Sequence, residues 1–149
     1  MKFDSRPSSP ESLKTFALTR VVSDMDIDEM GHVNNVVYIS WMHEVAVAHA
    51  AFLGWTAERH RKDGLGWVVR KHQINYHRPA FAGESIKVRT WIRGFTMAGC
   101  SRQFEVCRIG ESEECLVTAA TDYAMINLAT GRPTRIPEGV AQSFNALAQ

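Results

Sequence analysis

The segment 35–53 constrains the fold more than any other part of the chain, because it combines helical character with apolar residues on nearly every side. Asn34 or Asn35 suits the N-cap of this helix, and Gly54 suits its end. Apolar side chains cover one side of the helix and most of the rest: Val37, Trp41, Ala48 and Ala51, then Tyr38, Met42, Val45 and Phe52. Such a helix must be buried over most of its surface. The other elements therefore have to wrap around it.

The segments around this helix have the alternation and β-branched composition of strands. One strand is predicted before the helix, at 16–22, and four after it, at 67–76, 85–93, 101–109 and 115–128. Residues 78–83 are predicted to form a turn, and the tail 137–149 to be weakly helical. The order predicts an α+β fold in which a curved antiparallel sheet wraps a long central helix, with the last four strands as a meander.

Size and composition predict a single domain over 1–149, with 1–13 as a flexible lead-in. The 149 residues have a formal net charge of +1, with 45% hydrophobic and 22% charged residues. This balance gives no reason to expect nucleic acid or an acidic membrane as a partner. No apolar run approaches the ~18 residues of a membrane span, and the N-terminus lacks the hydrophobic core of a signal peptide. A cytoplasmic location is expected.

The three cysteines argue against a disulfide framework and a structural zinc site, because their number is odd and no C-x-x-C pair occurs. We expect Cys100, Cys107 and Cys115 to be buried or half-buried strand residues. The histidines show no metal-ligand spacing, so no metal site is predicted. The open edges of the predicted sheet would be covered by pairing between subunits, which predicts at least a homodimer.

The stretch from Asp26 to Tyr38 concentrates the polar chemistry of the chain. It contains two spaced carboxylates, a glycine, a histidine and two asparagines, and it runs directly into the predicted helix. A carboxylate beside a helix start can attack a carbonyl or activate water against it. The free N–H groups of the first turn can hold the resulting oxyanion. The stretch therefore predicts an active site for acyl transfer.

Two sequence blocks resemble the hot-dog-fold thioesterases of the 4-hydroxybenzoyl-CoA and acyl-ACP thioesterase type. The first is Asp26-x-Asp28-x-x-Gly31-His32-Val33-Asn34-Asn35-x-x-Tyr38 with Trp41 and Glu44, and the second is Tyr76-x-Arg78-Pro79-Ala80-x-x-Gly83-Glu84. The resemblance covers roughly residues 16 to 128. It implies hydrolysis of an acyl-CoA or acyl-ACP thioester, as in fatty acid metabolism, without metal or organic cofactor. It also implies a homodimer or a dimer of dimers with sites at the subunit interface.

The resemblance also assigns roles to residues. Asp28 matches the family's catalytic carboxylate, which acts as nucleophile or general base, and the backbone N–H of Asn35 matches the group that polarises the thioester carbonyl. His32 matches the histidine proposed as a base in the plant acyl-ACP enzymes. That plant pattern has an asparagine where this chain has Met30, which favours the simpler scheme of Asp28 with the helix-end oxyanion hole. Gly31, Asn34 and Tyr38 are expected to bind substrate.

Each residue also has a plainer interpretation. Asp28 could only cap a turn, because aspartate is common there, and His32 could only pack. Asp26 is expected to stabilise the loop. Glu44, on the buried helix, is the rival carboxylate, although a structural ion pair is the favoured interpretation. The strand basic residues are expected on solvated faces, where some could contact CoA phosphates: Arg70, Lys71, Arg78, Arg89, Arg93 and Arg102.

Two other functions fit the same residues. A hot-dog hydratase or dehydratase also needs an Asp/His pair at a helix end, but the Gly31–Asn35 context fits thioesterases better. A non-enzymatic module that binds an acyl carrier could keep the fold without the chemistry, although the intact Asp28 and His32 argue against it. Release of free thiol from a panel of acyl-CoA substrates would discriminate among the three.

Overall fold

The computed structural model describes residues 15–146. The predicted lead-in at 1–13 and the last residues of the tail, 147–149, lie outside this range. The elements are β1 (Phe16–Val21), the 3₁₀ turn η2 (Asp24–Asp26), α1 (Asn35–Phe52), α2 (Ala57–Lys62), β2 (Leu65–Tyr76), β3 (Ser85–Phe95), β4 (Gly99–Ile109), β5 (Glu113–Asn127) and α3 (Glu138–Ala146). The predicted helix and five strands are confirmed, with ends that differ by no more than two residues.

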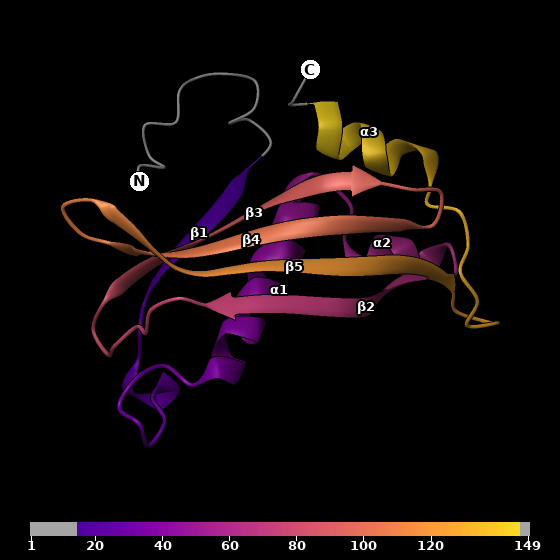
Figure 1. Cartoon of the computed structure of the whole chain (residues 1–149). Helices are drawn as coiled ribbons and strands as arrows, with labels where there is room; N and C mark the ends of the chain where they lie inside the picture. The colour runs from indigo at the N-terminus through magenta and orange to yellow at the C-terminus, as the bar shows by residue number, and fades with distance from the viewer. Residues whose placement is uncertain (1–14, 147–149) are drawn as a thin grey trace.

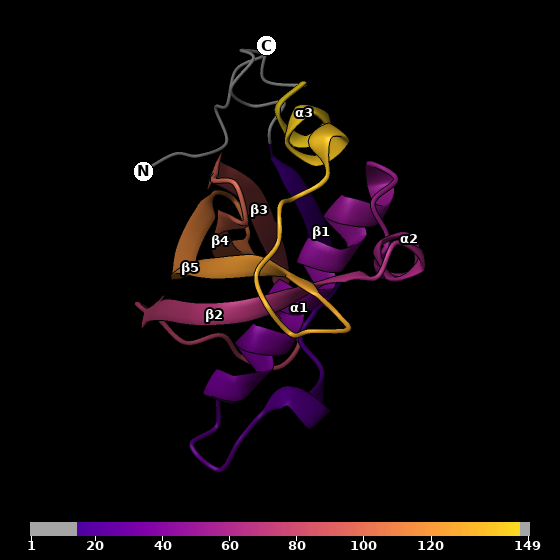
Figure 2. The same ribbon diagram turned by 90° about the vertical axis from the view of Figure 1, so that its right-hand side faces the viewer.

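The strands form one antiparallel sheet in the order β1-β3-β4-β5-β2, and this sheet curves around α1 (Figures 1 and 2). The predicted meander is therefore correct only for β3, β4 and β5. β2 pairs with β5, from Leu65 opposite Asn127 to Tyr76 opposite Val117. The link from β2 to β3 is not a hairpin, because its backbone is bonded to other segments. Val33 N donates to Ala80 O, and Gly83 N to Val22 O, each at 2.9 Å.

One side of α1 packs on the sheet and forms the main core. Its buried residues include Tyr38, Trp41, Met42 and Val45, which pack against apolar strand residues such as Ile86 and Phe104. The opposite side of the helix is not covered by the described chain. Val36 is 67% exposed, Val47 51% and Phe52 69%. The helix that sequence predicts to be buried nearly all round is thus buried on one side only within a single chain.

Helix α3 completes a second core at the C-terminal end of α1. Val140 and Phe144 of α3 are buried against Trp55 and Met125, and the indole N–H of Trp55 donates to Ser143 Oγ at 2.9 Å. The weak helix predicted in the tail is therefore present and packed. The short helix α2, capped by the side chain of Thr56, was not predicted, because six residues are too few for a clear apolar period.

The strand arginines differ from the sequence expectation at two positions. Arg70, Lys71, Arg78 and Arg93 are exposed, as predicted. Arg89 and Arg102 are buried, with 7% and 4% exposure. The alternation along β4 explains Arg102, because Cys100, Phe104 and Val106 on the same face are also buried. Cys107 is buried as well and Cys115 is half-buried, as expected for cysteines in strands.

Candidate active site

The loop between β1 and α1 is folded back on itself by local hydrogen bonds. Ser23 and Asp26 form a capping box around η2, in which Asp26 Oδ2 accepts from Ser23 N at 3.0 Å. Ile27 pairs with Val33 as an antiparallel bridge, and Asn34 N donates to Asp26 O at 2.9 Å. Asp26 therefore has the loop-stabilising role that the sequence predicts.

Asp28 organises the tight turn at the tip of this loop. Its Oδ1 accepts from Met30 N at 2.9 Å, its carbonyl accepts from Gly31 N at 3.0 Å, and its N–H donates to His32 O at 3.0 Å. Gly31 has φ of +88°, a conformation that favours glycine. One carboxylate oxygen of the half-buried Asp28 thus shapes the turn. The other oxygen, Oδ2, has no hydrogen bond to a described residue.

The start of α1 leaves one backbone donor open. Asn34 is the N-cap, and its Oδ1 accepts from Val36 N at 2.9 Å, while its carbonyl accepts from Val37 N at 2.9 Å. The N–H of Asn35 has no acceptor among the described residues. Because this N–H lies at the positive end of the helix dipole, it is suited to bind an anion or a polarised carbonyl oxygen.

A pocket of about 190 Å³ opens at this helix start. Three predicted site residues, His32, Asn35 and Tyr38, contribute to its lining. The His32 ring also packs edge-on to Phe81, with 6.3 Å between ring centroids. The remaining lining residues are Val33, Tyr76, His77, Arg78 and Pro79.

The other three predicted residues, Asp28, Gly31 and Asn34, do not line this pocket within one chain. They build the turn before α1 and the cap at its start. Asp28 is joined to the lining through its backbone hydrogen bond to His32 O.

Tyr76 lines the pocket but was not among the predicted site residues. Its hydroxyl donates to the carbonyl of Asn35 at 2.9 Å, and its ring packs against Tyr38, with centroids 5.6 Å apart. Burial raises the pKa of both phenols, so both keep their proton near neutral pH. The second motif block, which begins at Tyr76, was the signal that could have identified this residue.

Glu44, the rival carboxylate, forms an ion pair with Arg20 of β1. Its side chain is 56% exposed, so it is not the buried group that sequence suggests. The Arg20 guanidinium also lies over the Trp41 ring, 5.2 Å from its centroid. The predicted structural ion pair is confirmed, and Glu44 does not line the pocket at the helix start.

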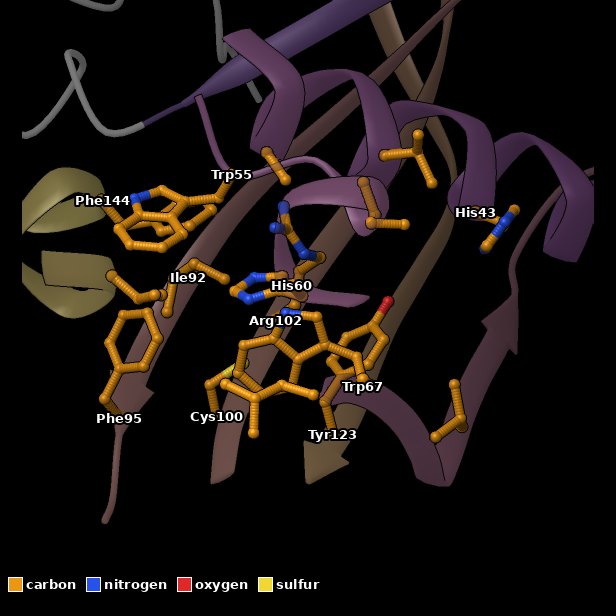
Figure 3. A pocket seen from close by; sticks show the side chains of 18 of the residues that line it. His43, Trp55, His60, Trp67, Ile92, Phe95, Cys100, Arg102, Tyr123 and Phe144 are labelled. Atoms are coloured by element: carbon orange, nitrogen blue, oxygen red, sulfur yellow. The ribbon is translucent and has the colours of Figure 1, made fainter. Parts of the chain in front are cut away.

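A second and larger cavity, of about 400 Å³, lies beside the C-terminal half of α1 (Figure 3). Residues of α1, α2, α3 and strands β2 to β5 line it, and no lining residue is shared with the first pocket. Aromatic and aliphatic side chains make most of its wall: Trp55, Trp67, Ile92, Phe95 and Phe144. Two separate cavities therefore lie along α1.

Within residues 15–146, no group of three or more histidine, cysteine, aspartate or glutamate side chains could hold a metal ion. In the same range, no helix is both long and apolar enough to cross a membrane.

Comparison with known proteins identifies the family. The sequence model of the thioesterase-like superfamily matches residues 22–144. The chain is 37% identical over 93 residues to the chloroplastic acyl-(acyl-carrier-protein) hydrolase FATB3 of Cuphea viscosissima. This match covers 61% of this chain and 22% of that protein. Five curated relatives match, and the matched regions span between 20% and 39% of their lengths.

Solved structures show the same architecture. A 1,4-dihydroxy-2-naphthoyl-CoA thioesterase from Synechocystis superposes with a TM-score of 0.82 at 20% identity, over 91% of this chain and 98% of the other. A Staphylococcus aureus protein solved in complex with CoA gives a TM-score of 0.83 at 16% identity, over 90% and 84% of the two chains. The fold is therefore the hot-dog fold. The chain belongs to the thioesterase-like superfamily, as the sequence resemblance predicted.

Proposed function

We propose that this protein hydrolyses an acyl thioester of coenzyme A or of an acyl carrier protein at the pocket that opens at the start of α1. The observation that carries the proposal is the open N–H of Asn35, a residue that lines a pocket together with His32, whose carbonyl accepts from the N–H of Asp28. A curated relative is an acyl-carrier-protein hydrolase, and a protein of the same fold was solved in complex with CoA. The ligands of these two proteins are of the same class as the substrate proposed for this pocket.

The proposed reaction needs little more than the groups at this site. A thioester carbonyl is electrophilic and a thiolate is a good leaving group, so moderate activation suffices. As a general base, Asp28 takes a proton through its open Oδ2 from a water molecule that attacks the carbonyl. As a nucleophile, Asp28 attacks the carbonyl itself and forms an anhydride, which water then cleaves. The Asn35 N–H holds the developing oxyanion. The C–S bond breaks, a C–O bond forms, and the thiolate takes up a proton.

The pocket is proposed to be completed by a second copy of the chain. Within the described residues, β2 lies at an edge of the sheet with no strand on its outer side. Val69 and Tyr76 of β2 are 48% and 42% exposed, and Val47 of α1 is 51% exposed. Pairing of two β2 edges would cover these side chains and bring a second subunit to the pocket beside Tyr76.

The test is release of free thiol from a panel of acyl-CoA and acyl-carrier-protein thioesters, measured with a thiol reagent. The panel should span short, medium and long chains and one aryl thioester. We expect hydrolysis of at least one member, lost in the variant Asp28→Asn. Absence of thiol release across the whole panel, with folded protein, would favour the non-enzymatic carrier-binding alternative.

A further inference from the structure

The larger cavity beside the C-terminal half of α1 contains two polar side chains that its apolar walls do not satisfy. His60 and Arg102 both line it, and Figure 3 shows them among the aromatic side chains of the wall. Each is almost completely removed from solvent, with 2% exposure for His60 and 4% for Arg102. Buried polar groups are normally hydrogen-bonded, so both residues need an explanation.

His60 of α2 has no hydrogen-bond partner on either ring nitrogen. Its ring stacks on Trp55, with 5.4 Å between centroids, and meets Trp67 edge-on. Burial lowers the pKa of this imidazole and the nearby Arg59 lowers it further, against a smaller opposing effect of Asp63. The ring is therefore neutral near pH 7. It offers one unused N–H donor and one unused acceptor.

Arg102 of β4 is a buried cation that has no counter-charge among the described residues. Its Nη1 donates to His49 Nδ1 and to Thr90 Oγ1, each at 3.0 Å. His49 is neutral, because burial and the charge of Arg102 lower its pKa to about 3. No carboxylate of the described residues lies within 4.0 Å of the guanidinium. Its Nε and Nη2 have no described acceptor.

Arg89, on the neighbouring strand β3, is a buried arginine of the same sheet that pairs with carboxylates. It pairs with Glu105 at 2.9 Å and with Glu113 at 3.1 Å. A buried charge without such a partner is costly. The contrast indicates that the partner of Arg102 is supplied from outside the described chain.

We propose that the cavity binds an apolar carboxylic acid, whose carboxylate pairs with Arg102 and whose hydrocarbon part packs between Trp55, Trp67 and Phe144. A carboxylate accepts two parallel N–H groups from a guanidinium, which is the geometry that the free Nε and Nη2 offer. The volume of 400 Å³ is near the lower end of ligand pockets, roughly 300–1,000 Å³, and suits a medium-length acyl chain or one aromatic ring.

The expected source of this carboxylate is a free carboxylic acid, such as a product of thioester hydrolysis. A phosphate group fits less well, because it brings more charge into an apolar cavity than one guanidinium offsets.

The test of the free acid is calorimetric titration of the full chain with octanoate and with octanol, which has the same chain length but no charge. We expect octanoate to bind at least tenfold more tightly than octanol. Arg102→Gln should remove that preference, whereas Arg93→Gln, which removes an exposed arginine of β3, should keep it. Thermal unfolding of each variant checks the fold. If Arg102→Gln does not fold, the comparison of the two ligands on the unaltered protein still decides.

Arg102-dependent binding of octanoate without any thioester hydrolysis refutes the proposed function and leaves the cavity's assignment intact. Equal affinity of the unaltered protein for octanoate and octanol overturns the assignment.

Discussion

The hydroxyl of Tyr76 donates a 2.9 Å hydrogen bond to the carbonyl of Asn35, and so joins the last residue of β2 to the first residue of α1. The same Asn35 residue has the open N–H that is proposed to hold the oxyanion. Tyr76 therefore fixes the first turn of the helix relative to the edge strand that borders the pocket. The two residues are 41 positions apart in the chain.

Tyr76→Phe removes this hydrogen bond but keeps the ring that packs on Tyr38. We expect kcat/KM for thioester hydrolysis to fall by roughly tenfold, because small errors in the position of a catalytic group are costly. The free energy of unfolding should change by no more than about 1 kcal/mol, since Tyr76 is 42% exposed. Thiol-release kinetics and urea unfolding measure the two effects. An unchanged kcat/KM would show that Tyr76 does not position the helix start.

Asp28→Asn tests the proposed carboxylate. The amide keeps an oxygen that can accept from Met30 N, so the turn at Gly31 should remain and the fold should survive. We expect kcat to fall by about 10²-fold or more, the usual worth of acid–base catalysis. The measurement is kcat on the best thioester of the panel, with circular dichroism as a check of folding. Near-normal turnover in this variant would remove Asp28 from the mechanism.

The sequence could predict those parts of the site that depend on hydrogen bonds between residues close together in the chain. The capping box of Ser23 and Asp26, the turn of Asp28 and the cap by Asn34 join residues two or three positions apart. Residue types and spacing encode such contacts directly. The long helix was also predictable, because its apolar residues are numerous.

Contacts between distant segments could not be predicted in this way. The place of β2 depends on which strand of the sheet it pairs with, and spacing does not give that choice, so the meander was predicted in error. The burial of Arg102 follows from the register of β4, where it shares a face with Phe104. Only the folded chain brings Arg102 and His60 to one cavity.

The proposed homodimer predicts twice the mass of one chain by light scattering at micromolar concentration. Val69→Lys, on the edge strand β2, should shift the mass toward that of a monomer, because a lysine on an edge opposes strand pairing. Met97→Lys is the matched control, since Met97 is 63% exposed and lies in the turn between β3 and β4. A monomer mass for the unaltered protein would contradict the dimer.

His32→Ala should reduce kcat/KM less than Asp28→Asn does. His32 lines the pocket and packs edge-on to Phe81, and no hydrogen bond joins its ring to a described residue that could orient it as a base. Met30, beside it in the turn, has no group to complete a histidine-based network. We therefore expect His32 to orient water or substrate, with a loss of up to ~10²-fold.

The comparison requires matched kcat/KM values for His32→Ala and Asp28→Asn on one acyl-CoA. His32→Gln serves as the conservative control, because it keeps a polar side chain at the pocket and should recover part of the activity. If the histidine variant is the more damaged and the glutamine variant recovers nothing, His32 is the base. Asp28 then supports it through the turn in which Asp28 N donates to His32 O at 3.0 Å.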